Sequence, residues 1–306
     1  MNIVQNRKIY YIISSVLIIA SIASVAVFGL NFGIDFKGGS IFETSYTERP
    51  ELSVVQDIVS KQGVGESSIR PIGEDGYIIR TKSLNEAERS AFVQALNTGE
   101  GFELKRSDSV GPILGKELQG KAITSIIIVI VAIILFITFV FRKVSEPVSS
   151  FKYGLVAIVA LIHDIIIPAG AFALLGYYLG FEVDALFVTA LLVVLGFSVH
   201  DTIVVFDRVR EHLKVQNELK EKDPKMELKS FEQIVGESVD ETFTRSLTTS
   251  FTVLLSLVIL YFFGAEATRS FSLALLIGIL AGTYSSIFLA SPLLVTIQKW
   301  QEKRKK

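Results

Sequence analysis

The sequence predicts a polytopic α-helical membrane protein with six transmembrane helices and a small α+β extracytoplasmic domain between the first and the second. Half of its 306 residues are hydrophobic, and they form long unbroken blocks instead of the short periodic stripes of soluble domains. Between the first two blocks lies a segment with the alternating patterns and turn residues of a folded domain. Six blocks reach the roughly 20 residues that cross a bilayer as a helix: residues 9–30, 122–141, 153–175, 185–206, 243–263 and 271–297.

The composition excludes several kinds of site. There is no cysteine, which excludes disulfides, thiolate metal sites and thiol catalysis. The 30 basic and 31 acidic side chains nearly cancel, so nothing indicates binding of nucleic acid. No paired aspartates or metal ligands stand at suitable spacing, so we expect neither an enzyme nor a metal or other cofactor.

The distribution of lysine and arginine predicts the orientation. Basic residues are concentrated between the second and third blocks, within residues 207–242 and in the tail at 298–306, which by the positive-inside rule places both termini in the cytoplasm. Arg7 and Lys8 precede the first block, but its apolar core exceeds the ~7–15 residues of a signal peptide, so an uncleaved helix is expected. The predicted organisation is a first helix in 1–30, an extracytoplasmic domain in 31–121, a five-helix region in 122–297 with a cytoplasmic loop at 207–242, and the tail.

The segment 31–121 has the pattern of a ferredoxin-like sandwich. Strands are predicted at 40–46, 67–72, 77–81 and 102–107, and helices at 51–62 and 84–96. Ser83 is the predicted N-cap of the second helix, and Gly99 lies beyond its end. The order β-α-β-β-α-β is that of the ferredoxin-like fold. Without histidine or cysteine, the segment is best interpreted as a recognition or spacer domain.

Two glycine-rich segments flank this domain. We interpret both as junctions between a helix and the domain; no strand-to-helix phosphate cradle surrounds them. Glycine permits tight turns and close approach of backbones. A further hypothesis is therefore that Gly38 and Gly39 form a hinge for movement of the domain relative to the membrane. In the first segment, Asp35 could form an ion pair with Lys37 at the membrane surface. The candidate motif residues are Gly33, Asp35, Gly38 and Gly39 in the first segment, and Gly111 and Pro112 in the second.

A carboxylate inside the fourth block is the main candidate functional group. Asp201 lies roughly 10 Å inside the cytoplasmic boundary of that helix. A charge at the centre of a span costs roughly 2.5–3.5 kcal/mol, so it usually faces a partner or a water-filled cavity. Arg245 enters the fifth block from the same side, and an Asp201–Arg245 ion pair would satisfy both. His200 precedes the carboxylate, with a structural or a relay role.

Two interpretations of this pair remain open. An apolar surrounding makes a carboxylate hold its proton more tightly, and a nearby guanidinium has the opposite effect. A motion of Arg245 relative to Asp201 would therefore change proton affinity, as a proton-coupled motor requires. The alternative is a static ion pair that locks two helices together.

Further polar residues lie in the third and sixth blocks. His163 and Asp164 come just before Pro168, which frees a backbone carbonyl. They either satisfy that local need or line the same proton route. The sixth block carries small residues that suit close helix packing, namely Gly278, Gly282, Ser285 and Ser286.

Five motifs resemble those of a known family. They are GIDFKGG at 33–39, VGPILGKEL at 110–118, HDTIVVFDRVRE at 200–211, TRSLTTS at 244–250 and FSLALLIGILAGTYSSIFLASPLL at 271–294. In this order and spacing, over almost the whole chain, they closely resemble the SecF family of the resistance–nodulation–division superfamily. The family's proton-linked carboxylate corresponds to Asp201 and its companion arginine to Arg245. One departure is His200, where relatives commonly have Asp or Asn.

The resemblance implies a function in protein export across the bacterial cytoplasmic membrane. A SecF-like subunit forms a complex with SecD and assists late translocation of preproteins through the SecYEG channel. The proton gradient drives it, while ATP use is left to SecA, in keeping with the absence of a Walker motif. The chain contains no SecD-like half, so we expect a separate subunit surrounded by lipid.

Two alternative functions remain. A proton-driven exporter of small molecules or lipids in the same superfamily would usually have large domains in both halves of a twelve-span chain, whereas this chain has six spans and one small domain. A purely structural assembly factor would tolerate Asp201→Asn.

Overall fold

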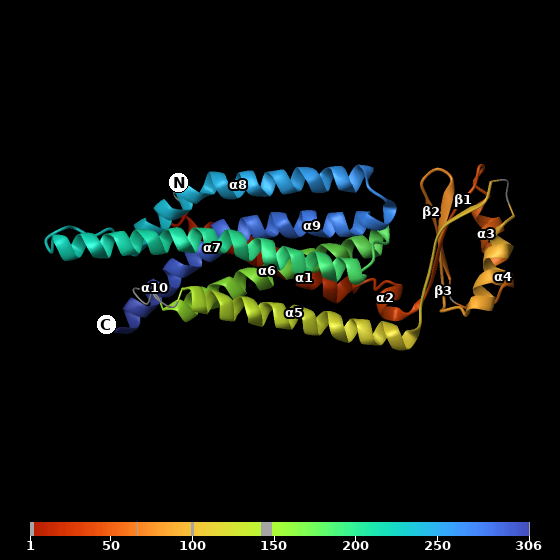
Figure 1. The fold of residues 1–306 in the computed structure, drawn as a ribbon, viewed down its shortest axis with the longest axis horizontal. Helices are drawn as coiled ribbons and strands as arrows, with labels where there is room; N and C mark the ends of the chain where they lie inside the picture. The colour runs from red at the N-terminus through yellow and green to blue at the C-terminus, as the bar shows by residue number, and fades with distance from the viewer. Residues whose placement is uncertain (1–2, 66, 99–100, 142–148, 306) are drawn as a thin grey trace. The chain divides into compact units, whose positions relative to one another are not determined.

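The computed structural model describes residues 3–65, 67–98, 101–141 and 149–305. They divide into two compact units, Met1–Asn31 with Thr124–Lys306, and Phe32–Ile123 (Figure 1). Arg142 and Lys143, which contributed to the predicted orientation, lie outside the described residues.

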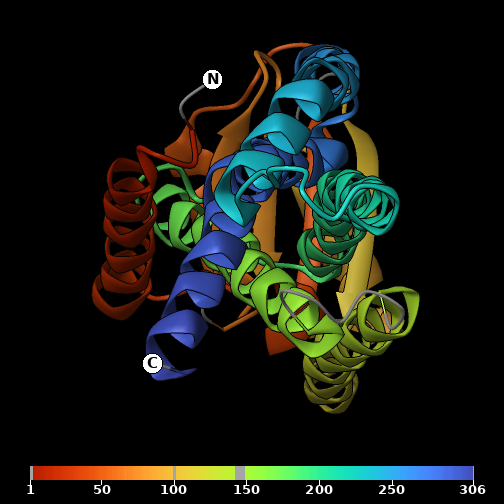
Figure 2. The same ribbon diagram turned by 90° about the vertical axis from the view of Figure 1, so that its left-hand side faces the viewer.

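The first unit is a bundle of long helices. Six helices of the described chain are long and apolar enough to cross a membrane, which confirms the predicted number; the last of them combines three consecutive elements. Figure 2 looks at the bundle from one end. Its elements are α1 (Arg7–Phe28), α5 (Pro112–Val140) from Thr124 onward, α6 (Ser150–Leu179), α7 (Ala185–Lys222), α8 (Phe231–Phe263), α9 (Glu266–Tyr284), the π-helix η1 (Ser285–Ala290) and α10 (Ser291–Lys305).

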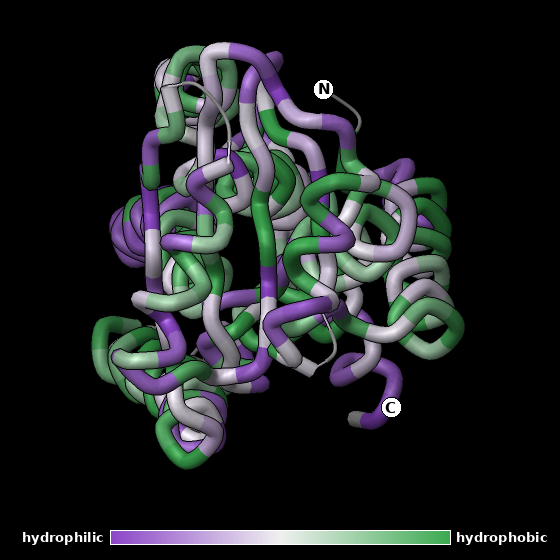
Figure 3. Tube along the Cα trace, turned by 90° about the vertical axis from the view of Figure 1, so that its right-hand side faces the viewer, coloured by the Kyte–Doolittle hydropathy of each residue, from purple (hydrophilic) through white to green (hydrophobic). Residues whose placement is uncertain are grey.

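The helices differ in how much of their apolar surface the chain covers. In the most hydrophobic part of α1 and of α5 only 6% of the residues are buried, compared with 50% in α6 and 61% in the last span. Figure 3 colours the chain by hydropathy, and green hydrophobic segments alternate with white and purple ones along the trace. In water such surface would be strongly unfavourable, so the exposed sides of α1 and α5 require lipid or other transmembrane helices.

The segment predicted as a cytoplasmic loop at 207–242 is mostly helical. α7 continues to Lys222, and α8 already begins at Phe231. Ser230 caps α8 in a capping box, in which its hydroxyl accepts from the Gln233 amide and the Gln233 side chain accepts from the Ser230 amide. Apolar residues of this extension, such as Leu213 and Phe231, are buried, so packing stabilises helix where the charge pattern indicated only a loop.

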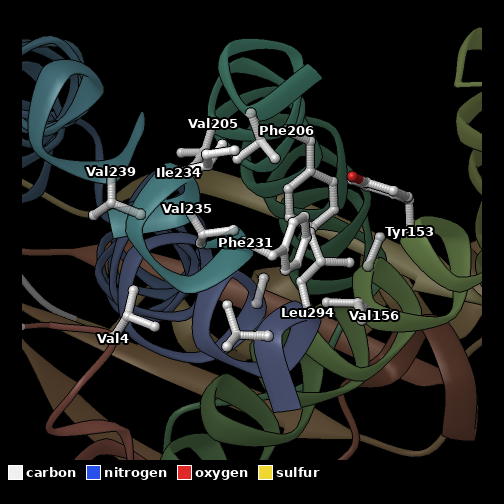
Figure 4. Close-up of a cluster of buried hydrophobic side chains, with 14 of the residues drawn as sticks. Val4, Tyr153, Val156, Val205, Phe206, Phe231, Ile234, Val235, Val239 and Leu294 are labelled. Carbon is white, nitrogen blue, oxygen red and sulfur yellow. The ribbon is translucent and has the colours of Figure 1, made fainter. Parts of the chain in front are cut away.

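The helices α6, α7, α8 and α10 pack together through one cluster of buried hydrophobic side chains (Figure 4). Tyr153 and Phe206 pack edge to face with ring centroids 5.2 Å apart, a favourable geometry, and both are completely buried. At the same end, Glu232 of α8 forms ion pairs with Arg7 of α1 and Lys299 of α10. These ion pairs join the start of α8 to the start of α1 and to α10.

Glycines allow unusually close approach between helices. A Cβ atom on Gly278 of α9 would lie 2.3 Å from Val194 of α7, and one on Gly282 would lie 2.9 Å from the Cβ of Ser198. Neither leaves room for a side chain. The predicted close packing of the small residues in the sixth span is therefore confirmed.

The second unit is a sheet with two helices. The four strands have the order β2-β3-β1-β4, and every pair is antiparallel. The predicted strands and helices are all present with slightly shifted ends. The elements are α2 (Ile34–Lys37), β1 (Gly39–Ser45), α3 (Leu52–Lys61), β2 (Ser68–Ile72), β3 (Gly76–Thr81), α4 (Glu86–Leu96) and β4 (Glu103–Val110).

The core of this unit lies where α3 and α4 pack on the sheet. Phe42 of β1 and Phe92 of α4 are completely buried, with ring centroids 4.8 Å apart. The predicted N-cap of α4, Ser83, is wrong. Asn85 is the cap, because its Oδ1 accepts from the Glu88 amide at 2.9 Å while the Glu88 carboxylate accepts from the Asn85 amide, a reciprocal capping box.

Candidate functional site in the helical unit

A buried carboxylate of α6 is the centre of a polar cluster. Asp164 and its neighbour His163 are both fully buried, and His163 Nδ1 lies 2.8 Å from Asp164 Oδ1. The hydroxyl groups of Ser198 on α7 and Ser285 on η1 donate to Asp164 Oδ2 at 2.5 and 2.8 Å. Three polar groups from three elements therefore surround this carboxylate, as a buried anion requires.

Ser198 joins this carboxylate to a second set of hydroxyl groups. Its backbone carbonyl accepts from Ser286 of η1 and from Thr202 of α7, each at 3.2 Å. The Thr202 and Ser286 hydroxyl oxygens are themselves 2.8 Å apart. All three side chains are at least 99% buried. Ser198 is thus tied to α6 through its side chain and to η1 through its main chain.

The π-helical turn brings two serines to the site. A π-helix is rare and usually occurs as one turn inserted in an α-helix, often at a functional site. Here it occupies Ser285–Ala290, just before Pro292, which lacks an amide hydrogen. The Ser291 hydroxyl donates to the carbonyl of Ser286, five residues back, at 2.9 Å. The wider turn directs Ser285 and Ser286 to α6 and α7.

Asp201 follows Ser198 by one turn of α7, in a different environment. Its side chain is 3% exposed, and its Oδ2 atom is buried without a hydrogen-bond partner among the residues that the structure describes. Leaving a buried polar atom unpaired costs roughly 1–3 kcal/mol, and more when the group is charged. A group retained at that cost in a membrane helix marks a candidate functional site.

The predicted Asp201–Arg245 ion pair is not formed in the described part of the chain. Arg245 lies on α8 with an exposed side chain, while the next residue, Ser246, is 1% exposed. Consecutive helical side chains differ by about 100° in direction, so the face that buries Ser246 turns Arg245 outward. His200 is also exposed.

His163 and Asp164 do not serve the carbonyl freed by Pro168. Their described hydrogen bonds join the two side chains to each other and the carboxylate to Ser198 and Ser285. His163 Nε2 is buried with no partner in the described residues. The Tyr284 ring stacks beside the imidazole, with centroids 6.0 Å apart.

The two glycine-rich segments pack on each other in the second unit. Gly38 has φ of +77°, and a Cβ atom there would lie 2.9 Å from the Cα of Pro112. Gly39 has φ of +139°, and its Cβ would lie 2.8 Å from the carbonyl of Thr81. Gly115 adjoins the backbone of Gly38 just as closely. Only glycine suits these positions.

The remaining predicted motif residues take ordinary places around this contact. Gly33 is the N-cap residue of α2, and Asp35 lies in its first turn. Gly111 has open space where a Cβ would be. Pro112 is the first residue of α5, where the missing amide hydrogen costs nothing. In the described ranges no three His, Asp or Glu side chains form a metal-binding group.

Sequence reasoning missed Ser198 and Thr202 as members of the site. Ser198 lies three residues before Asp201, and Thr202 lies four residues after Ser198; a helix places residues three and four apart on one face. This spacing was the available signal. Ser285 and Ser286 were predicted only as packing residues.

Comparison with known proteins agrees with the motifs. Residues 92–300 match the family model for the C-terminal region of the protein export membrane proteins SecD and SecF, and residues 23–48 match the SecD/SecF GG motif. The chain is 41% identical over 315 aligned residues to protein translocase subunit SecF of Thermobaculum terrenum, covering 99% of this chain and 94% of that one. The chain belongs to the SecF family.

Other relatives show how far the likeness to SecF extends. SecF of Anaerolinea thermophila is 36% identical, with 96% of this chain and 93% of that protein covered. The crystal structure of SecDF, a translocon-associated membrane protein from Thermus thermophilus, matches with a TM-score of 0.81 at 27% identity. That match covers 98% of this chain but only 38% of the SecDF chain. SecDF in its super-membrane-facing form matches with a TM-score of 0.64. A multi-pass membrane protein of the SecF family fits all these findings.

Proposed function

We propose that this SecF-family chain works with SecD as an accessory subunit of the Sec translocase that uses the proton gradient to promote late translocation and release of exported proteins. The observation that carries the proposal is the buried Oδ2 atom of Asp201, which has no partner in the described chain. A proton bound there removes the charge and with it most of the cost of burial. Asp201 is therefore the proposed proton-coupling residue, with no enzymatic step.

The proton gradient supplies enough energy for such a role. One elementary charge that crosses 100 mV releases about 2.3 kcal/mol, which changes a conformational equilibrium about 50-fold. Protonation of Asp201 would favour conformations in which the carboxylate is enclosed, and deprotonation would favour those in which it meets water or a cation. Arg245 is the proposed cation, reached when α8 moves relative to α7. His200, exposed beside Asp201, has a tuning role; His163 and Asp164 are weaker members of the same proton-coupling set.

The exposed surfaces support a partner such as SecD within the membrane. Arg245 is exposed on a helix long enough to span the bilayer, where lipid is an unfavourable neighbour for a guanidinium. Large apolar side chains are also exposed on α5, among them Ile127, Ile128 and Phe136. We assign the surface around Arg245 to contact with SecD, and the apolar surface of α5 to SecD or lipid. We further propose that the assembled complex contacts SecYEG, SecA and the preprotein.

The proposed topology places the sheet domain outside the bacterial cytoplasmic membrane and both termini inside. The β-α-β-β-α-β order and the antiparallel arrangement β2-β3-β1-β4 support a ferredoxin-like domain. The basic residues of the α7–α8 connection and of the C-terminal tail support a cytoplasmic location for both. The proposed organisation is the N-terminus with the first transmembrane helix in 1–30, the extracytoplasmic domain in 31–121, the five-helix region in 122–297 and the cytoplasmic tail in 298–306.

Release of an exported protein from spheroplasts tests the proposal. The test compares Asp201→Asn with Asp207→Asn, since Asp207 lies on the same helix but is exposed. Asparagine preserves the shape of the side chain and cannot ionise. We expect Asp201→Asn to abolish release that depends on the proton gradient while SecD still copurifies, and Asp207→Asn to preserve it. Unchanged release with Asp201→Asn would reduce this residue to a structural role.

A further inference from the structure

We propose that His163 and Asp164 form a second proton-binding site, whose occupancy is transmitted through Ser198 and Ser285 to the turn of α7 that carries Asp201. This inference rests on the proposed proton coupling and assigns it a second site. It starts from geometry: a carboxylate and an imidazole 2.8 Å apart, both with no exposed surface, inside a bundle that spans a membrane.

The net charge of the pair explains why it binds one proton. Ionised Asp164 with neutral His163 has a net charge of −1, which is costly in a buried apolar setting. One added proton makes the pair neutral, either as imidazolium with carboxylate or as imidazole with carboxylic acid. Among the described residues, His163 and Asp164 form an ion pair only with each other, so no described lysine or arginine supplies the compensating charge.

His163 Nε2 is the atom at which the proton can arrive. It is buried and has no hydrogen-bond partner in the described structure. With Nδ1 carrying the hydrogen toward Asp164, Nε2 has a free lone pair. A proton that binds Nε2 makes the imidazolium, and the Nδ1 proton can then pass to Asp164 Oδ1. The proton count balances: one enters, and one is shared within the pair.

Among the described residues, the other ionisable side chains near the pair lie on α9 and α7. Tyr284 of α9 stacks on the His163 ring, and its hydroxyl donates to the backbone carbonyl of Tyr10 on α1 at 3.0 Å. On α7, His200 and Asp201 lie two and three residues beyond Ser198. Of these two, Asp201 is buried and His200 is exposed.

The hydrogen bonds from Ser198 and Ser285 depend on the charge of Asp164. Hydrogen bonds to an ionised carboxylate are roughly twice as strong as those between neutral groups, so Ser198 and Ser285 are held tightly while Asp164 is ionised and loosely when the proton resides on the Asp164 carboxyl group. Ser198 is also bonded through its carbonyl to Ser286. Because Asp201 lies only three residues, about 4.5 Å along the helix axis, from Ser198, a change at Asp164 shifts the turn that presents Asp201.

Infrared difference spectroscopy on the lipid-reconstituted complex with SecD tests the site without an export assay. The protonated carboxyl group of each buried aspartate gives a C=O stretching band that disappears as pH rises. We expect Asp164→Asn to remove one band and Asp201→Asn to remove another. If Asp164→Asn leaves every carboxyl band unchanged between acidic and alkaline pH, Asp164 does not exchange a proton and the inference is overturned.

Nitrogen NMR provides the second readout, because the chain has only 3 histidines. With histidine-labelled protein, His163→Gln identifies the His163 signals. We expect the ring nitrogen shifts of His163 to titrate in the wild type and to respond to Asp164→Asn. Shifts that stay constant over the whole pH range would contradict proton exchange at the pair.

Proton flux separates this inference from the proposed function. In proteoliposomes, Asp164→Asn keeps a carbonyl oxygen for the two serines but cannot ionise, so we expect a flux about tenfold lower with a flattened pH profile. A positioning role alone would leave the pH profile of Asp164→Asn unchanged. Normal flux in Asp164→Asn with loss in Asp201→Asn would overturn the second site and preserve the first; normal flux in Asp201→Asn would refute the proposed function.

Discussion

Two buried aspartates of this protein differ in what their carboxylates contact. Asp164 is bonded to one imidazole and two hydroxyl groups, whereas Asp201 has a buried oxygen with no partner in the described chain. Burial is costly for both, but among the described residues hydrogen bonds to the carboxylate offset that cost only at Asp164. At the scale of the residue, Asp164 thus organises its neighbours, and Asp201 is left ready for a proton or a cation.

Removing one donor to Asp164 tests its organising role. Ser198→Ala leaves Ser285 as the one serine donating to Oδ2, and we expect unfolding to become easier by about 1–3 kcal/mol. Ser272→Ala is the matched control, because that buried hydroxyl donates only to the Thr268 carbonyl of its own helix. Thermal unfolding of both variants in detergent gives the comparison; equal losses would show that Ser198 has no special role.

The sequence revealed one of these aspartates more clearly than the other. Asp201 stands out because a charge interrupts an apolar block, and that needs no tertiary information. The importance of Ser198 depends on which helix it faces, and serines in membrane helices often bond only to their own backbone, as Ser272 does. The Asp201–Arg245 contact was wrongly predicted for this structure because proximity to one membrane boundary does not determine which way a side chain points.

At the scale of elements, glycines and the π-turn set the distance between helices. Gly278 and Gly282 bring α9 against α7, and η1 then places two serines on the neighbouring helices. The small residues were readable from the sequence. The π-turn was not, because the phase shift from one extra residue falls within a single turn, and the periodicity of a window of about 11–18 residues does not resolve it.

Adding one methyl group tests this packing. In Gly278→Ala the Cβ would lie 2.3 Å from Val194, and we expect a loss of about 1–3 kcal/mol from overpacking. The control is Gly196→Ala on α7, where nothing lies within 4 Å and alanine favours helix by about 1 kcal/mol. Opposite shifts in melting temperature are expected. A stable Gly278→Ala protein would contradict the close α7–α9 contact.

The paired glycines of the second unit allow a similar comparison. Gly38→Ala strains a position with φ of +77° and pushes into Pro112, whereas Gly111→Ala enters open space. We expect Gly38→Ala to slow export and to destabilise the domain, by roughly 1–2 kcal/mol for the backbone strain alone, and Gly111→Ala to have little effect. Export rate and protease resistance measure the two effects. Slow export with full protease resistance would favour the hinge hypothesis over close packing.

At the scale of the whole molecule, the division into a helical unit and a sheet unit follows from hydropathy. Long apolar blocks predicted the spans, and alternating patterns predicted the strands. The extension of α7 and α8 beyond the predicted spans was not predicted, because charged residues obscured the buried apolar positions Leu213 and Phe231. Which surface meets the partner subunit depends on a second chain and cannot be read from this one.

The absence of cysteine makes the proposed topology directly testable. Single cysteines at two exposed positions, Ser53→Cys in α3 and Asn217→Cys in the extension of α7, should react differently with a membrane-impermeant thiol reagent. We expect labelling of the first from outside intact spheroplasts, and of the second only after lysis. The reverse pattern would invert the topology.

Proton flux through the reconstituted complex with SecD tests proton coupling at Asp201 most directly. Proteoliposomes with an imposed pH gradient report flux through an enclosed dye, and Asp201→Asn is compared with Asp207→Asn on the exposed part of the same helix. Proton coupling at Asp201 predicts that flux falls to the level of empty liposomes in the first variant and stays at the wild-type level in the second. Wild-type flux in Asp201→Asn would contradict it.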